Sequence, residues 1–349
     1  MIGVFVSLCV ISCVEIHFST MTDLGSPYLV RHLYRIALGL VLFTIVLLVD
    51  YRVWLSKILA VYVLTLLVLM LVLFLGVEIH ASKSWVRLAG ITFQPSELAK
   101  LVVVMTLAKF LGESPEKYLK PGMVLVTGLV ALIPAGLIVL QRDLGTAILI
   151  LPVFFGMLMV GGIRKKVILA AGLAMALILA GSWFVLRDYQ RARIMVVIDP
   201  ELDPRGTGYQ TMQSVIAIGS GSLTGRGFGN GSQGALGFLP ERHTDFIFSV
   251  IGEEMGFLGA AFVLALYAVL LLRILRVALE TTDKTALYAC VGIATLYSVH
   301  LIVNVGMALG LLPVIGIPLP PLSYGGSSVV TMFIALALVN NFRIHRYLV

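Results

Sequence analysis

Residues 55–76 read LSKILAVYVLTLLVLMLVLFLG, and this stretch decides the fold class. It is apolar over about 20 residues, the length that an α-helix needs to cross a hydrocarbon core of about 30 Å. Lipid offers the backbone no hydrogen-bond partners, so such a stretch is expected to be helical. Similar stretches recur along the chain and predict an all-α integral membrane protein with about ten transmembrane helices, at 2–18, 34–49, 55–76, 96–111, 122–140, 144–161, 167–186, 246–272, 286–310 and 327–342.

The composition excludes a soluble domain, because 59% of the 349 residues are hydrophobic and 12% are charged. A β-barrel would instead show short alternating segments. The chain is therefore interpreted as a single polytopic membrane domain over 1–349. Its first span is expected to be a retained helix, since neither a basic region nor a small-residue cleavage site follows Met1. The cysteines are interpreted as buried hydrophobes without a disulfide or a metal: Cys9, Cys13 and Cys290.

Lysine and arginine are distributed unevenly between the two sets of loops, which predicts the orientation of the chain. One set holds Arg52, Lys57, Lys109, Lys117, Lys120, Arg164, Lys165, Lys166, Arg273, Arg276, Lys284, Arg343 and Arg346. The opposite set holds Arg31, Arg35, Lys83, Arg87 and Arg142. The richer set is expected to be cytoplasmic, which places both termini in the cytoplasm. The net charge of +7 reflects mostly this bias and does not argue for nucleic acid.

The connection over about 187–245 is predicted to be a large extracytoplasmic loop between the seventh and eighth spans. A loop of about 60 residues is usually functional or disordered, and this one is not of low complexity. Its YQTMQSVIAIG segment favours a short helix at the membrane interface. The following run, 219–237, is dense in glycine. GRGFGNG within it is not a dinucleotide fingerprint, because no strand precedes it and no helix opens from its last glycine.

The loop ends in ERHTD, residues 241–245, directly before the apolar eighth span. Asp245 is close to an N-cap position, where a carboxylate accepts N–H bonds from the first helical turn. A serine or asparagine would cap as well, and Glu241, Arg242 and His243 crowd the same turn. A carboxylate beside cationic groups, at the mouth of an outward-facing cavity, is also what a general base for a hydroxyl nucleophile requires.

Two charged residues lie inside the fourth span, close to its start in QPSELAK. Glu97 and Lys100 are spaced three residues apart, so they share one helix face. Ionisable residues within a membrane are rare and mark functional sites. The structural alternative is a helix-start carboxylate with a lysine that snorkels outward. Pro95 fits the first turn of this helix.

The remaining polar candidates are open to two interpretations each. Arg142 and Asp143 form either a functional pair or a local salt bridge. Glu253 and Glu254 lie further into the eighth span, and the sequence leaves their environment open. The last two candidates either bind phosphate or pyrophosphate or are solvated loop residues: Arg242 and His243.

Several stretches together resemble the SEDS family (shape, elongation, division and sporulation proteins), which are membrane glycosyltransferases that polymerise peptidoglycan. They are WVRLAGITFQPSELAK, QRDLGTA, YQTMQSVIAIGSGSLTGRGFG, FLPERHTDFIFSVIGEEMG and PLPPLSYGGSS. They occur in the family's order and span nearly the whole chain. FLPERHTDFIF and GLLPVIGIPLP resemble the elongation-type members, which maintain rod shape, more than the division-type members.

The resemblance implies the layout of the site. The family's essential aspartate falls on Asp245, and its transmembrane acid–base pair falls on Glu97 and Lys100. Arg87 lies in a region expected to line the central cavity. The SYGG segment lies in another such region and contains Ser323, Gly325 and Gly326. The N-terminus departs slightly from the family pattern, because it starts directly at the first span.

The implied activity is transfer of a growing glycan from undecaprenyl pyrophosphate to the 4-hydroxyl of the GlcNAc unit of lipid II. The donor linkage is α and the product linkage is β-1,4, so the reaction is expected to invert and to need one base, Asp245. The leaving pyrophosphate needs positive charge. The candidates to supply it are Arg87, Lys100, Arg242 and a divalent cation, Mg²⁺ or Mn²⁺.

The resemblance also implies a location and partners. The location is the bacterial cytoplasmic (inner) membrane. The partners are membrane lipids, a class B penicillin-binding protein transpeptidase and other elongation-complex proteins, with no nucleic acid. The main alternative is a lipid II flippase, which explains the intramembrane charges but not the dense loop ending in ERHTD. A non-catalytic scaffold would not need Glu97 and Lys100 in the membrane.

Overall fold

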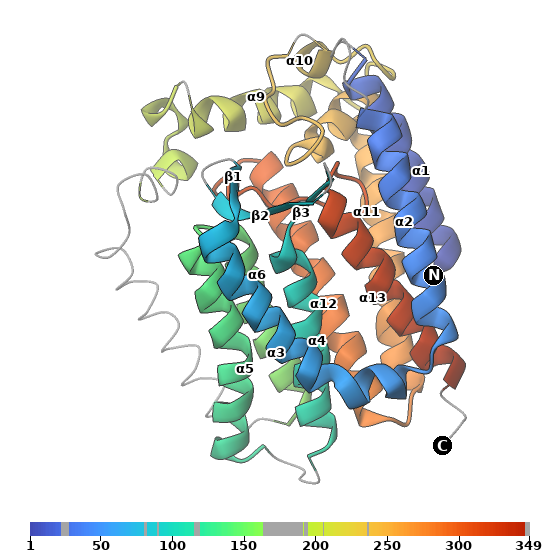
Figure 1. Cartoon of the computed structure of the whole chain (residues 1–349). Coiled ribbons are helices and arrows are strands. Elements are labelled where there is room, and N and C mark those ends of the chain that lie inside the picture. Colours follow the sequence, from blue (N-terminus) through green and yellow to red (C-terminus); the bar gives the residue numbers. More distant parts are fainter. Residues whose placement is uncertain are drawn as a thin grey trace.

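The computed structural model describes residues 1–21, 28–79, 82–88, 91–114, 119–162, 191, 195–204, 206–235 and 237–345. They form a bundle of long helices, as predicted (Figure 1). The helices are α1 (Ile2–Ser19), α2 (Tyr28–Leu48), α3 (Tyr51–Leu75), α4 (Pro95–Gly112), α5 (Pro121–Leu140), α6 (Leu144–Val160), α11 (Ile247–Glu280), α12 (Lys284–Ala308) and α13 (Gly326–His345). Each predicted span has its helix, except 167–186, which lies outside the described residues.

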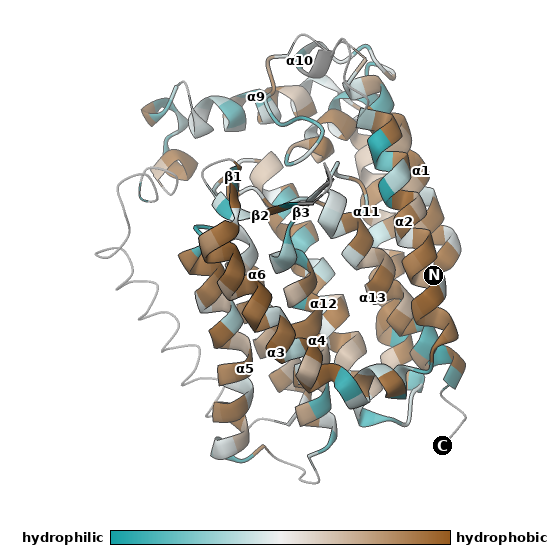
Figure 2. Ribbon diagram, in the orientation of Figure 1, coloured by the Kyte–Doolittle hydropathy of each residue, from teal (hydrophilic) through white to brown (hydrophobic). Residues whose placement is uncertain are grey.

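The long helices are those of a multi-pass membrane protein. Within the described residues, 7 helices are long and apolar enough to cross a membrane: α1, α2, α3, α5, α11, α12 and α13. α4 differs because it carries Glu97, Lys100 and Lys109, and α6 is slightly short at 17 residues. Apolar residues predominate along the long helices (Figure 2).

α2 begins earlier than predicted, at Tyr28 and not at residue 34. The charged side chains of Arg31 and Arg35 interrupt the apolar run, but they do not interrupt the helix. Both arginines therefore belong to α2 and not to a loop.

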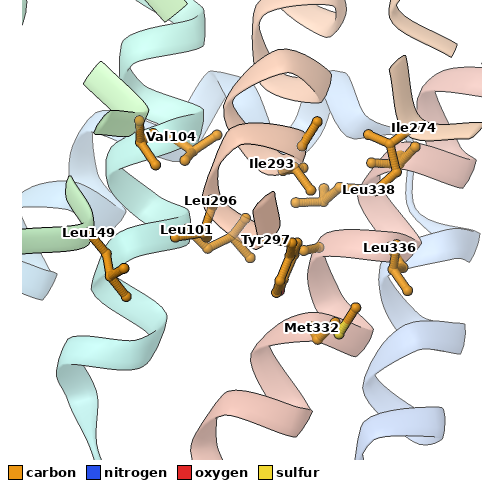
Figure 3. Packing of buried hydrophobic residues seen from close by; sticks show 14 of the residues in the cluster. Leu101, Val104, Leu149, Ile274, Ile293, Leu296, Tyr297, Met332, Leu336 and Leu338 are labelled. Atoms are coloured by element: carbon orange, nitrogen blue, oxygen red, sulfur yellow. The ribbon is translucent and has the colours of Figure 1, made fainter. Parts of the chain in front are cut away.

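α4, the span that carries Glu97 and Lys100, is largely buried inside the bundle. It packs against α3, α5, α6, α12 and α13. Leu101 and Val104 of α4 lie in the same apolar core as Leu149 of α6 and Leu296 of α12 (Figure 3). Lipid tails are as apolar as leucine, so close packing of this kind drives helix association in a membrane. Because α4 is surrounded by protein, the buried side chains of Glu97 and Lys100 face other helices and not lipid.

One end of the bundle carries the irregular segments and is called the loop end (Figure 1). It holds an antiparallel sheet of β1 (Val77–Ile79), β2 (Ser82–Leu88) and β3 (Ile91–Phe93) in the order β1-β2-β3. The sheet was not predicted, because β1 and β3 have only 3 residues each and β2, SKSWVRL, does not alternate clearly between polar and apolar residues. The loop end also holds η1 (Pro200–Leu202), α9 (Thr207–Ser220) and α10 (Ser232–Ala235). α9 confirms the helix predicted over YQTMQSVIAIG.

α11 is interrupted at Gly256, where φ is 67° and ψ is −166°. The break leaves backbone groups of α11 without helical partners, and the glycine-dense run supplies them. The bonds run from Phe257 N to Ser222 O (2.9 Å), Leu258 N to Leu223 O (3.1 Å), Arg226 N to Glu253 O (3.0 Å) and Gly227 N to Glu254 O (3.0 Å). The run 222–227 is therefore joined to the helix by its backbone.

Replacing Gly256 with alanine is expected to destabilise the protein. A Cβ at this position would lie 2.3 Å from Gly225 N and 2.7 Å from Leu223 O. The backbone conformation itself costs a non-glycine residue about 1–3 kcal/mol. Thermal unfolding in detergent measures the effect. Gly219→Ala in α9 is the control, because its Cβ would meet nothing within 4 Å. Equal unfolding temperatures for the two variants would contradict the prediction.

Candidate active site

The ERHTD segment forms a tight turn that begins at Glu241, whose φ is 51°. The Glu241 carbonyl accepts hydrogen bonds from the N–H groups of Thr244 (3.1 Å), Asp245 (3.1 Å) and Phe246 (3.3 Å). Phe246 is the N-cap residue of α11, which starts at Ile247. Asp245 therefore precedes the N-cap by one residue, close to the cap as the sequence suggested.

Asp245 is partly buried and is held from the side of α12. Asn304 Nδ2 donates to the Asp245 carbonyl at 2.9 Å and to the Ile317 carbonyl at 2.8 Å. A Cβ on Gly316 would lie 3.5 Å from Asp245 Oδ2, so the carboxylate lies directly beside this glycine. The side-chain amide of Asn304 thus bridges the Asp245 turn and the proline-rich segment 313–321.

Ser323 fixes the same turn from the other side. Its hydroxyl donates to the Thr244 carbonyl at 2.6 Å and accepts from Leu319 N at 2.7 Å. The next residue, Tyr324, donates its backbone N–H to the His243 carbonyl at 2.8 Å. The structure therefore brings the SYGG segment and the ERHTD segment together, although about 80 residues separate them in sequence.

Glu97 and Lys100 form a buried ion pair with an Nζ–Oε1 distance of 2.8 Å. Lys100 Nζ also lies 2.9 Å from His300 Nε2. An ammonium group only donates hydrogen bonds, so His300 Nε2 accepts here and the imidazole proton is on Nδ1. Nδ1 lies 2.9 Å from the Pro318 carbonyl and donates to it. The lysine is therefore enclosed between α4 and α12 and does not snorkel.

α12 connects the ion pair to Asp245. His300 and Asn304 are four residues apart, so they lie on one face of the helix. His300 accepts a hydrogen bond from Lys100, and Asn304 donates one to the Asp245 carbonyl. Sequence reasoning missed both residues. The available signal was a pair of polar residues four apart inside an apolar span, which marks a protein-facing polar stripe.

The other predicted residues lie at the loop end in different settings. Arg87 is exposed on β2, where it pairs in register with Thr92 of β3. Arg242 is buried and not solvated, at 7% exposure. The His243 ring lies 4.6 Å from the Tyr28 ring of α2. Of the SYGG glycines, Gly325 precedes α13 and Gly326 is its first residue.

Arg142 and Asp143 have separate roles. Arg142 Nη1 lies 3.7 Å from Glu78 Oε1, and both side chains are more than half exposed, at 57% and 59%. Asp143 caps α6 by accepting from Thr146 N at 3.1 Å, and it also accepts from Gln94 Nε2 at 2.7 Å. These contacts favour the structural interpretation for both residues.

Glu253 supports the loop above α11. Its Oε1 accepts from Gln233 N at 2.9 Å and from the Ser232 hydroxyl at 3.2 Å, which holds α10 in place. Glu254 is buried in the same helix turn, at 4% exposure. The contacts of Glu253 indicate an anchoring role.

The described residues contain no group of three or more His, Cys, Asp and Glu side chains that could hold a metal ion.

The fold and the site define a polytopic membrane protein with a buried acid–base pair and an aspartate at one end of the bundle. The chain belongs to the FtsW/RodA/SpoVE family, because the family model described as "Cell cycle protein" matches residues 1–348. It is 36% identical to the peptidoglycan glycosyltransferase MrdB of Escherichia coli K12 over 349 residues, which cover 99% of this chain and 93% of MrdB. It is 37% identical to stage V sporulation protein E of Bacillus subtilis, with coverages of 91% and 87%.

Solved structures are similar over the whole chain. One belongs to a study of polymerisation and crosslinking by a peptidoglycan synthase complex. It has a TM-score of 0.85, 32% identity and coverages of 99% of this chain and 98% of that one. The rod shape determining protein RodA of Thermus thermophilus has a TM-score of 0.75, 30% identity and coverages of 99% and 96%. The predicted family and fold class are therefore confirmed.

Proposed function

We propose that the chain is a peptidoglycan glycosyltransferase that polymerises lipid II for cell elongation and rod shape. The observation that carries the proposal is that one face of α12 contacts both parts of the site. His300 on this face binds Lys100 of the buried ion pair, and Asn304 binds the Asp245 turn. An aspartate held in this way at the loop end suits a base that acts on a substrate outside the bilayer core. The names of the relatives, including the peptidoglycan glycosyltransferase MrdB, support the same activity.

The proposed reaction is a single displacement that inverts the anomeric centre. Asp245 accepts the proton of the GlcNAc 4-hydroxyl as the oxygen attacks C1 of the lipid-linked glycan. The new C1–O4 bond forms while the bond from C1 to the pyrophosphate oxygen breaks. The electron pair leaves with the pyrophosphate, whose growing negative charge requires nearby cationic groups. One base is sufficient, because no covalent intermediate forms.

The expected location is the bacterial inner membrane, with both termini in the cytoplasm. The loop end then faces outward, where lipid II presents its sugars. A class B penicillin-binding protein is the proposed partner, and a structure similar to this chain comes from a peptidoglycan synthase complex. Other elongation-complex proteins are proposed to assemble with this chain and the penicillin-binding protein.

The purified chain in detergent is expected to convert fluorescent lipid II into glycan chains on a gel. A divalent cation, Mg²⁺ or Mn²⁺, is expected to accompany the substrate pyrophosphate, so EDTA should slow the reaction and excess Mg²⁺ should restore it. EDTA already saturated with Mg²⁺ is the control. Transfer of lipid II across liposomes without polymer formation would instead identify a flippase and refute the proposal.

A further inference from the structure

Arg35 of α2 is a cationic side chain without a counter-ion among the described residues. Its guanidinium carbon lies 4.2 Å from the centre of the Tyr324 ring. Its Nη1 atom is buried and has no hydrogen-bond partner there. Nearly all buried donors in proteins are paired, so an unpaired one points to an acceptor that the described part of the chain does not supply. The side chain as a whole is partly exposed, which leaves a ligand access to it.

Two of the cationic residues expected from the sequence, Lys100 and Arg87, are less well suited to this role. Lys100 is already neutralised by Glu97 at 2.8 Å. Arg87 lies exposed on β2. Arg35, in contrast, has no carboxylate partner among the described residues, and its Nη1 has no acceptor there. It lies beside the segments that hold Asp245.

Gly326 makes room for Arg35. A Cβ at this position would lie 2.8 Å from Arg35 Nε and 3.0 Å from its Cζ, so any other residue would displace the guanidinium. Gly326 is also the first residue of α13. The N-terminus of a helix carries a partial positive charge, which adds to the charge of Arg35 in attracting an anion.

Tyr324 connects Arg35 to the catalytic turn. The Tyr324 ring lies 5.6 Å from the His243 ring, and its backbone N–H bonds the His243 carbonyl at 2.8 Å. His243 precedes Asp245 by two residues. An anion bound against Arg35 would therefore lie next to the turn that presents the proposed base.

We propose that Arg35 binds the pyrophosphate of a lipid-linked sugar, in a subsite completed by Tyr324 and the start of α13. This inference rests on the proposed function. Arginine suits the role because its planar fork bonds two phosphate oxygens at once and is weakly hydrated. Where the bound pyrophosphate is that of the glycan donor, Arg35 also stabilises the charge that develops on the leaving group.

The test is inhibition of lipid II polymerisation by undecaprenyl pyrophosphate, with the KM for lipid II measured in parallel. For Arg35→Gln, the inhibitory concentration or the KM is expected to rise about 10- to 100-fold, as for loss of a charged hydrogen bond. A rise in the inhibitory concentration alone would show that Arg35 binds the pyrophosphate of the donor. A rise in the KM alone would show that it binds the pyrophosphate of the acceptor. Arg35→Lys should give a smaller rise, because it keeps the charge and loses the fork. Gly326→Ala should resemble Arg35→Gln.

Arg142→Gln is the matched control, since Arg142 is an exposed arginine near the loop end with a surface partner. It should behave as wild type. If Arg35→Gln unfolds, Arg35→Lys carries the test, and thermal unfolding identifies folded variants. If a folded Arg35→Gln has the wild-type inhibitory concentration and KM, the Arg35 subsite is refuted and the polymerase proposal stands. Where Arg35→Gln unfolds, wild-type values for Arg35→Lys refute the subsite in the same way. A wild-type chain that does not polymerise lipid II would refute the polymerase proposal itself.

Discussion

Asp245→Asn is expected to abolish polymerisation of lipid II and to leave the fold intact. The amide has nearly the shape of the carboxylate but accepts a proton far less readily. Loss of a general base lowers the rate by about 10²- to 10⁴-fold. The backbone bonds of this turn, including that from Asn304 to the Asp245 carbonyl, do not depend on the side-chain charge. The measurement is the initial rate of glycan formation in detergent, together with the thermal unfolding temperature.

Asp50→Asn is the matched control for the structural alternative. Asp50 caps α3, where its side chain accepts from Arg52 N at 2.8 Å. Asparagine caps a helix about as well as aspartate, so this variant should be stable and active. If Asp245→Asn also polymerises at the wild-type rate, Asp245 acts only in the helix start and the base lies elsewhere.

Lys100→Ala is expected to reduce both activity and stability. Glu97 would remain buried without its counter-ion, and breaking a buried pair in this way costs about 3–5 kcal/mol. His300 would lose the donor to its Nε2. Polymerisation rates and thermal unfolding measure the two effects separately. Lys109→Ala on the same helix is the control, because Lys109 makes a partly exposed contact with Glu113 at 3.9 Å.

The double variant Glu97→Gln/Lys100→Met separates a structural from a functional ion pair. It removes both charges and keeps similar volumes, which is often neutral for stability. Stability should therefore recover relative to Lys100→Ala, while activity should stay low. A double variant with wild-type activity would show that the pair serves the fold alone.

The helical spans were predictable from sequence because a membrane imposes one simple requirement, an apolar length. Charged residues within a helix obscured its true start, as at Arg31 and Arg35 of α2. The sheet at β1–β3 was missed because β1 and β3 are only 3 residues long and the sheet depends on pairing between its strands. Local pattern carries little information about such pairing.

The candidate site was predictable residue by residue but not as a geometry. Glu97, Lys100 and Asp245 stand out in the sequence as charges beside or inside apolar runs. Their connection through His300 and Asn304 depends on how α12 packs, which no local pattern specifies. Arg35 appeared to be one of several basic loop residues, because its position against Tyr324 and Gly326 arises from contacts distant in sequence.

The backbone bonds between 222–227 and the break in α11 define how this protein can be recombined with its relatives. A chimera that takes only 187–245 from another member would set a foreign glycine run against Gly256 and its neighbours. Extending the donor segment past Leu258 transfers both halves of all four hydrogen bonds together. In functional chimeras between family members, the loop and the first part of α11 should therefore come from the same parent.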